Sequence, residues 1–515
     1  MTASSQHGIE QQDSSSPGVG ARKVFSALGY NVLAVGPTQG LGLLRGIILA
    51  RLLTPEAFGL FGIASMTIEA LSALSNFNLK NLLITLPFDQ KDLRNRWLDS
   101  VWLMEIMRGT IIFIAVWALS SFVSSFYGTP DLYPLLIMAG FAVFIAGFTN
   151  SAFTLYERDI EYRKVVLLEL LAALTGFCVS IGLTFWRRDA TVFVWGMISA
   201  NLLKVVMSFA WHQYRPTWRF DREILEKCLG FGKYFLIISL LTYITTQFDN
   251  LVLGKYMGLA SLGIYLVAYK LAMMPVDLML QVVNRVALPA YAKLYRDEPA
   301  NCFEKWSTNF ICLGWVFAAS SIALWVGGDY FISLIYGQKW VPPAGVFYML
   351  IGAGLFRGLT HITGSMVLAV NRPDIDAKAK IAETVVFVLL VLLLVPRFGM
   401  LGAGLAGLVC YGVALVFRTY FLLSLNPEMG RKLAAGFARL FFGIGILIGL
   451  TNLLEALSVP FLIRFGLVVL LVPCIGIMLE PLLREYIRAA LNSTVLQPFT
   501  QRFETWKASK QGTPL

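Results

Sequence analysis

Long apolar runs separated by short polar segments make up most of the chain. A helix that crosses the hydrocarbon core of a membrane needs about 20 mostly apolar residues. Fourteen runs meet this requirement, over residues 26–49, 58–86, 98–124, 132–154, 165–185, 190–211, 231–254, 260–288, 307–327, 343–369, 378–396, 400–424, 434–454 and 460–480. The pattern therefore predicts an all-α polytopic membrane protein with about 14 transmembrane helices.

The loop after the first run carries turn signals. It reads Ala50-Arg-Leu-Leu-Thr-Pro-Glu-Ala-Phe-Gly-Leu-Phe-Gly-Ile-Ala64. Thr54 can cap the start of a helix, Pro55 suits a first helical turn, and Glu56 suits the positive end of the helix dipole. These residues predict a tight loop between two membrane helices.

A related stretch follows 204 positions later, at Gly254-Lys-Tyr-Met-Gly-Leu-Ala-Ser-Leu-Gly-Ile-Tyr-Leu-Val-Ala268. At this offset Arg51 aligns with Lys255, and Gly59 aligns with Gly263. A duplicated membrane bundle is the usual plan of a secondary transporter. The chain is therefore interpreted as two copies of one bundle.

The repeat predicts two pseudo-symmetric six-helix lobes, an N-lobe at 24–211 and a C-lobe at 231–424. Two C-terminal helices follow at 425–480. Because each lobe holds an even number of spans, both copies share one orientation, the symmetry axis lies along the membrane normal, and a cavity lies between the lobes. Apolar and basic residues are mixed in the segment 212–230, which predicts an amphipathic linker helix on the cytoplasmic surface.

Lys and Arg set the orientation, because cytoplasmic loops carry an excess of them. With the N-terminus inside, the outer loops hold only Arg51, Arg187, Arg188, Lys255, Lys339 and Arg397. Both ends are then cytoplasmic, as a disordered N-terminus at 1–23 and a tail at 481–515. The first 20 residues lack the charge pattern and cleavage site of a signal peptide.

Composition narrows the function classes. Hydrophobic residues make up 57% and charged residues 14%, with mean hydropathy +0.68, whereas a soluble domain carries about 25% charged residues. Basic cytoplasmic loops account for the net charge of +11, so no nucleic-acid partner is expected. The six cysteines are scattered without a Cys-x-x-Cys pair and only three histidines exist; no metal site or other cofactor is expected.

Charged residues inside the predicted spans are the candidates for function. The cations are Arg45, Lys80, Arg108, Lys204, Lys270, Arg285, Arg357, Arg418, Arg439 and Arg464, and the acids are Glu69, Glu105, Glu169, Asp249, Asp277, Glu383 and Glu455. A charge at the membrane centre costs at least about 2.5–3.5 kcal/mol, so each needs a partner or a wet cavity. The excess of cations suits an anionic substrate better than a cationic drug.

Position along each helix selects the candidate cavity residues. Arg45 and Asp249 lie at matching depths in the first and seventh spans, and Lys270 and Asp277 share a face of the eighth. The main candidates are Arg45, Lys80, Asp249, Lys270, Asp277, Arg285 and Arg357, and the secondary candidates are Glu69, Lys204 and His361. Lys80 and Arg285 lie at equivalent cytoplasmic ends, where they either meet an anionic group of a substrate or extend to the membrane surface.

Other charges are interpreted as structural. Glu105 and Arg108 are three residues apart and can pair with each other. Glu169 and Glu383 stay undecided. Arg418, Arg439 and Arg464 lie near span ends and are expected to reach the membrane surface.

Four stretches resemble a known family. The first loop is similar to the first-loop signature of the polysaccharide transporter family, the Wzx-type flippases for lipid-linked oligosaccharides within the MATE/MOP exporter superfamily. Further similarity lies in Leu155-Tyr-Glu-Arg-Asp-Ile-Glu-Tyr-Arg-Lys, in Phe248-Asp-Asn-Leu-Val-Leu-Gly-Lys-Tyr-Met-Gly and in Ile335-Tyr-Gly-Gln-Lys-Trp-Val-Pro-Pro-Ala. The resemblance covers residues 25–480.

This resemblance implies a non-enzymatic flippase in the bacterial cytoplasmic membrane. It implies alternating access by two lobes, and a substrate of repeat-unit sugars on a polyprenyl diphosphate, used for exopolysaccharide, capsule or lipopolysaccharide synthesis. Membrane lipids, a polymerase and a chain-length regulator are the partners it implies. The sequence lacks a P-loop for ATP hydrolysis, so H⁺ or Na⁺ coupling is expected, with Asp249 or Asp277 as the candidate residues.

Three alternatives stay open at this point. A multidrug exporter of the same superfamily would favour an acid-rich cavity. A polysaccharide polymerase or polyprenyl-linked glycosyltransferase would favour a large outer loop with catalytic residues, and the predicted outer loops are short. A lipid II flippase shares the mechanism but fits the motifs less well.

Overall fold

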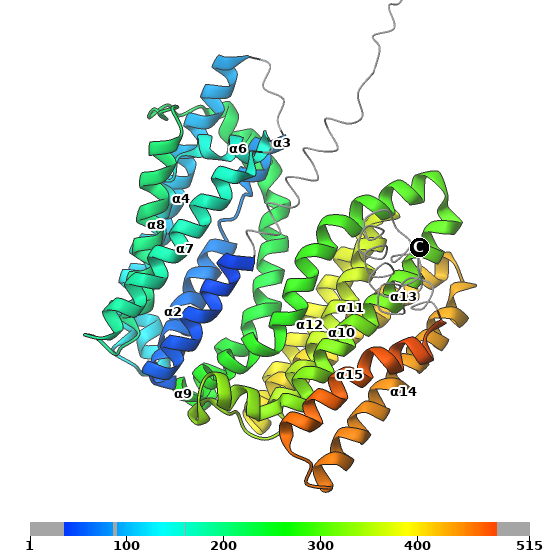
Figure 1. Cartoon of the computed structure of the whole chain (residues 1–515). Helices are drawn as coiled ribbons and strands as arrows, with labels where there is room; N and C mark the ends of the chain where they lie inside the picture. Colours follow the sequence, from blue (N-terminus) through cyan, green and yellow to red (C-terminus); the bar gives the residue numbers. More distant parts are fainter. Residues whose placement is uncertain (1–35, 86–89, 160, 482–515) are drawn as a thin grey trace, which may run out of the picture. The chain divides into compact units, whose positions relative to one another are not determined.

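The computed structural model describes residues 36–85, 90–159 and 161–481, and these residues form helices and no strands (Figure 1). A first helix covers 36–52. The others are α2 Pro55–Ala73, α3 Leu79–Thr85, α4 Lys91–Tyr127, α5 Leu132–Gly147, η1 Ser151–Phe153, α6 Thr154–Arg158, α7 Tyr162–Thr184, α8 Thr191–Trp211, α9 Arg222–Asp297, α10 Pro299–Ile335, η2 Gln338–Trp340, α11 Val346–Ala369, α12 Pro373–Phe398, α13 Met400–Leu425, α14 Met429–Ala456 and α15 Phe461–Leu479. The predicted all-α membrane fold is confirmed.

The predicted count of 14 spans is not confirmed. Within the described residues, ten helices are long and apolar enough to cross a membrane, or eleven if the bent pair Leu132–Gly147 and Ser151–Arg158 is one span. One of the ten is the 47-residue stretch Phe235–Gln281 of α9. At 1.5 Å per residue it is about 70 Å long, roughly twice the hydrocarbon thickness.

One predicted span is wrong for a local reason. The run 58–86 is not one helix, because the backbone leaves the helix between α2 and α3, where Asn78 has a φ of 53°. The runs 231–254 and 260–288 both belong to α9, but this element breaks at Gly258, where φ is 81°, so the predicted division between the two runs is confirmed. The predicted linker helix at 212–230 is helical only from Arg222 onward. The predicted N-terminus at 1–23 and, apart from residue 481, the predicted tail at 481–515 lie outside the described residues.

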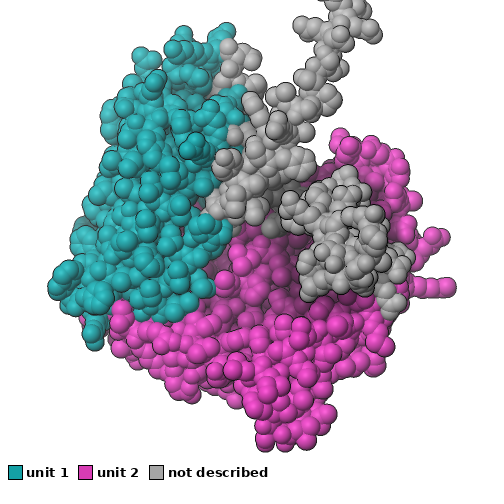
Figure 2. Space-filling model, in the orientation of Figure 1, with its two compact units in different colours: residues 1–49, 74–121, 133–236 teal, residues 50–73, 122–132, 237–515 magenta. Residues whose placement is uncertain are grey.

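The chain forms two compact units that do not follow chain order (Figure 2). Unit 1 holds 1–49, 74–121 and 133–236, and unit 2 holds 50–73, 122–132 and 237–515. The helix α2 therefore belongs to unit 2 although it lies early in the chain. The lobe limits given by the sequence repeat stay a prediction.

The two repeated stretches pack against each other inside unit 2. A Cβ atom at Gly59 of α2 would overlap the backbone of Leu259, and one at Gly263 of α9 would overlap the backbone of Pro55. These equivalent glycines let α2 and α9 approach at backbone distance. A further contact holds the first loop in place: the indole Nε1 of Trp340 donates a hydrogen bond to the Ala50 carbonyl at 2.8 Å.

Each unit has its own apolar core. In unit 2, α10 packs on α11 and α14, and α13 packs on α11 and α12, around side chains such as Trp306 and Phe317. In unit 1, α7 and α8 pack closely, and a second cluster around Leu83 and Leu98 joins α3 and α4 to the first turns of α9. Polar residues inside these apolar bundles therefore mark sites that need an explanation.

Candidate functional site

A polar cavity of about 500 Å³ lies within unit 2. Four helices line it: α9, α11, α12 and α13. Its polar lining residues are Thr242, Thr245, Thr246, Arg357, Thr360, His361, Ser365, Asp376, Lys380, Glu383, Tyr411 and Arg418. Six ionisable side chains other than tyrosine thus face one cavity in a bundle whose outer surface is apolar.

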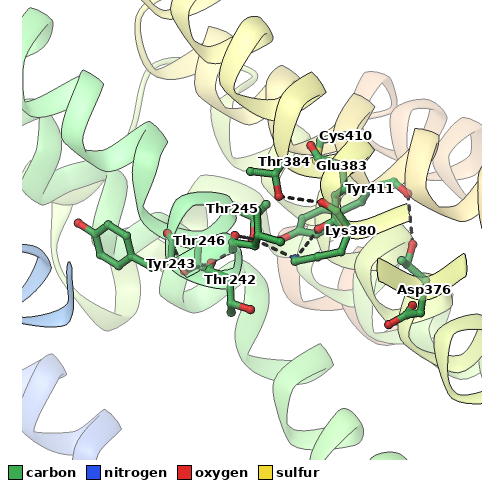
Figure 3. A network of polar contacts seen from close by, with 12 residues as sticks. Thr242, Tyr243, Thr245, Thr246, Asp376, Lys380, Glu383, Thr384, Cys410 and Tyr411 are labelled. Atoms are coloured by element: carbon green, nitrogen blue, oxygen red, sulfur yellow. Dashed lines mark hydrogen bonds and ion pairs between the residues drawn. The ribbon is translucent and has the colours of Figure 1, made fainter. Parts of the chain in front are cut away.

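Four charges of this cavity, those of Asp376, Lys380, Glu383 and Arg418, form one continuous network. The Lys380 ammonium donates to the Thr245 hydroxyl at 2.9 Å and pairs with Glu383 at 2.8 Å (Figure 3). Arg418 completes the network, at 3.5 Å from Glu383 and 2.8 Å from Asp376. The Glu383 and Arg418 side chains are only 3% and 6% exposed. Charges buried this deeply are stable only when paired, so the network joins α9, α12 and α13.

Arg357 brings the predicted residues to this cavity. It lines the wall one helical turn before His361, and its guanidinium pairs with Asp277 of α9 at 2.9 Å. Asp277 is not among the lining residues. A guanidinium has five N–H donors, so Arg357 can bond Asp277 and still offer donors to the cavity. The structure thus brings together Arg357, His361 and Asp277, while their role stays a prediction.

The other candidates of unit 2 lie apart from the cavity lining. Asp249 is buried and accepts a hydrogen bond from the Tyr265 hydroxyl at 2.8 Å. Glu69 accepts one from Gln247 at 2.7 Å. The side chain of Lys270 is exposed. Arg285 belongs to α9, and its side chain lies outside the described part of the structure.

The candidates of unit 1 are held in separate pairs. Lys80 pairs with Glu157 at 2.6 Å, and Lys204 pairs with Glu169 at 2.8 Å. Arg45 is half-buried in the first helix, with no ion pair inside the described ranges. The predicted pairing of Glu105 with Arg108 is confirmed at 2.7 Å.

Sequence reasoning missed half of the unit 2 network. Lys380 and Asp376 were not among the candidates, because they lie at the start of the predicted span 378–396 or just before it, whereas α12 begins at Pro373. The expectation that Arg418 reaches the membrane surface is wrong, because its side chain is buried against Asp376 and Glu383. A usable signal was present, since residues 376, 380 and 383 are spaced four and three apart and so share one helix face.

Comparison with known proteins assigns the family. A model of the family described as polysaccharide biosynthesis protein matches residues 48–344. The chain belongs to this family. Among its relatives, the lipopolysaccharide biosynthesis protein WzxC of Escherichia coli K12 is 26% identical over 414 residues, covering 79% of this chain and 82% of that protein. The succinoglycan biosynthesis transport protein ExoT of Rhizobium meliloti is 22% identical, covering 63% of this chain and 65% of that protein.

Solved structures share the fold. The lipid II flippase MurJ in an inward closed conformation matches with a TM-score of 0.68 at 13% identity, covering 90% of this chain and 100% of that chain. An inward-facing multidrug resistance MATE family transporter of the MOP superfamily matches with a TM-score of 0.58 at 14% identity, covering 76% and 96%. The family member described here therefore has the fold of membrane transporters.

Proposed function

We propose that this protein is a flippase that moves polyprenyl-diphosphate-linked oligosaccharide repeat units across the cytoplasmic membrane by alternating access. The family match carries the proposal, because it spans the repeated stretches and both glycine contacts of α2 with α9. Relatives named as a transport protein and as a probable glycan biosynthesis flippase support a transporter rather than an enzyme.

The unit 2 cavity supports the anionic part of this substrate. Arg357, Lys380 and Arg418 line it together with two carboxylates, Asp376 and Glu383. An anionic diphosphate or acidic sugar can bond the unused donors of Arg357, since charge-assisted bonds from a guanidinium to phosphate are strong and can be bidentate. A cavity for a cationic drug would need unpaired acids instead.

Orientation, coupling and partners complete the proposal. The excess of Lys and Arg in alternate loops favours cytoplasmic ends for the chain. Asp249, buried in α9 beside the Tyr265 hydroxyl, is our candidate for H⁺ or Na⁺ coupling. A polymerase and a chain-length regulator would use the product on the outer face.

Deleting the gene tests the proposal. We expect cytoplasm-facing polyprenyl-diphosphate oligosaccharide to accumulate and surface polymer to be lost, with wild type restoring both. Arg357→Ala should restore less than a tenth of the polymer because it removes a cavity cation. The matched control is Arg397→Ala, since Arg397 is exposed on α12, and it should restore at least half.

The contrary outcome is equally clear. A deletion strain that keeps its polymer and becomes sensitive to cationic drugs would reject the flippase and favour a multidrug exporter. Polymer loss without accumulation of the lipid-linked precursor would also contradict transport as the missing step.

A further inference from the structure

Unit 1 contains a second polar cavity, of about 320 Å³. It lies among α3, α4 and the turn between α5 and η1. Its lining residues are Asn76, Phe77, Asn78, Leu79, Lys80, Leu83, Val101, Glu105, Arg108, Ala146, Gly147, Thr149, Asn150, Ser151 and Thr154. Of these, the sequence analysis assigned only Lys80 to a binding role.

Two stretches of non-helical backbone contribute to the walls of this cavity. One interruption is the non-helical stretch between α2 and α3, where Asn78 has positive φ. The other separates Leu132–Gly147 from Ser151–Arg158, which are bent by 67°. Irregular backbone is rare in membrane proteins except where it lines a cavity, and broken helices commonly carry substrate sites. Two breaks on one cavity therefore point to a ligand.

Hydrogen bonds fix the second break in place. Asn150 donates through Nδ2 to the Tyr214 carbonyl at 2.9 Å and accepts from the Ala152 amide at 3.0 Å. Its own backbone N–H donates to the Ser208 hydroxyl at 3.0 Å. Asn150 thus shapes the wall of the cavity. Asn78, Glu105 and Arg108 are among its other polar lining residues.

The charges of this cavity compensate each other pair by pair. Glu105 accepts from Arg108 at 2.7 Å, and Lys80 pairs with Glu157 at 2.6 Å. A phosphate bound to the remaining donors of these cations would lie beside the paired carboxylates, which would repel it. A neutral sugar avoids this repulsion, because each hydroxyl can donate to a carboxylate and also accept from a cation or an amide. The chemistry favours an uncharged polyhydroxyl ligand.

The cavity lies at one end of the membrane-spanning part of α4. This helix is about 55 Å long, some 25 Å longer than a hydrocarbon core, and its charged residues are concentrated before Gly109. Asp99, six residues before Glu105, binds the segment that precedes α9 through the Thr217 amide at 2.8 Å. The cavity is therefore on the side of the membrane where this segment lies, the cytoplasmic side in the proposed orientation.

We propose that the unit 1 cavity is a subsite for an uncharged sugar residue of the transported glycan. This inference rests on the proposed function. Asn78, Glu105 and Arg108 contact the sugar hydroxyls, with the Phe77 ring adding apolar surface.

Ligand NMR on the full-length chain in lipid nanodiscs tests the subsite. The probes are free glucose, galactose and N-acetylglucosamine, observed by saturation transfer from the protein, and inorganic diphosphate, observed by ³¹P line broadening. Glu105→Gln removes the carboxylate charge. Asn78→Gly removes the amide while glycine still adopts positive φ without strain. The matched control is Asn371→Gly, because Asn371 of unit 2 is exposed and has a φ of 58°.

We expect saturation transfer to at least one sugar in wild type and an at least threefold loss in both unit 1 variants. Asn371→Gly should keep the transfer, and neither unit 1 variant should change the ³¹P broadening. The subsite is rejected if wild type shows no transfer to any of the three sugars or if both variants leave it intact. Loss of diphosphate broadening in these variants would also overturn it, as the cavity would then be a phosphate site.

The two proposals can fail separately. Sugar contact that depends on Asn78 and Glu105, in a protein whose deletion strain keeps its polymer, would retain the subsite and reject the flippase. A strain that accumulates lipid-linked precursor, with a protein that shows no sugar contact, would do the reverse.

Discussion

The charged side chains of the two polar cavities differ in how they are paired and how deeply they are buried. In unit 1 the charges form separate pairs, such as Glu105 with Arg108, whose side chains are 30% and 31% exposed. In unit 2 they form a chain of contacts through Glu383 and Arg418, which are almost fully buried. Exposed pairs contribute about 0–1 kcal/mol each, whereas buried ones depend strongly on both partners.

This difference predicts which charged residues can be substituted singly without a large loss of stability. A unit 1 pair can lose one member, because water reaches the charge that remains. Glu383 or Arg418 cannot be removed alone in this way, because the loss of either leaves a buried charge of the opposite sign. A ligand charge bound in the unit 2 cavity would therefore change the ion pairs between several helices at once.

The largest expected effect tests this contrast directly. Glu383→Ala leaves Lys380 and Arg418 without their shared carboxylate, and we expect the free energy of unfolding to fall by about 3–5 kcal/mol. Glu105→Ala in unit 1 is the matched variant and should cost about 1 kcal/mol or less. Chemical unfolding of the purified protein in detergent measures both. Equal losses would show that burial does not separate the two cavities.

A buried carboxylate in unit 1 sharpens the comparison. Asp99 accepts from the Tyr214 hydroxyl at 2.6 Å and from the Thr217 amide and hydroxyl at 2.8 and 2.7 Å. Burial and then Asp99 raise the pKa of Tyr214, so this phenol stays a donor at neutral pH. Asp99→Asn offers one acceptor oxygen fewer, and we expect the free energy of unfolding to fall by about 1.5–3 kcal/mol.

Limited proteolysis of the segment 212–221 adds a local measurement for Asp99→Asn, because this segment is what the carboxylate holds. Asp159→Asn is the control, since Asp159 is exposed. If Asp99→Asn matched this control in stability and in cleavage rate, the cost of losing a charge would depend on the unit rather than on burial.

The smallest effect is expected for the loss of a surface ion pair in unit 1. Arg96 hydrogen-bonds Asp221 and lowers the pKa of this carboxyl. Its contribution to stability is present above the ordinary carboxyl pKa and is lost as the pH falls through the lowered value. Asp221→Asn keeps the side-chain cap on the Glu223 amide but removes the charge. The melting temperature of wild type should exceed that of the variant slightly at pH 6, and the gap should close toward pH 3. A gap that widens in acid would contradict the assignment.

Sequence analysis succeeded where structure depends on neighbours in the chain. Hydropathy gave the helical membrane fold, and the three-residue spacing of Glu105 and Arg108 gave their ion pair. It failed for Arg418, because its partner Asp376 lies 42 positions earlier on another helix, and burial at a helix end depends on which helix covers it. The end of α2 was missed because an apolar run does not show where its backbone turns.

The position of α2 has a consequence for synthesis of the chain. Its Gly59 packs on the backbone of Leu259, about 200 residues later. A ribosome adds about 5–20 residues per second, so α2 spends roughly 10–40 s in the membrane before its partner exists. Over that interval the helices α4, α7 and α8 are synthesised. Biogenesis therefore requires a temporary neighbour for α2, either lipid or the insertion machinery, and a chain truncated before α9 would leave this helix permanently without its native contact.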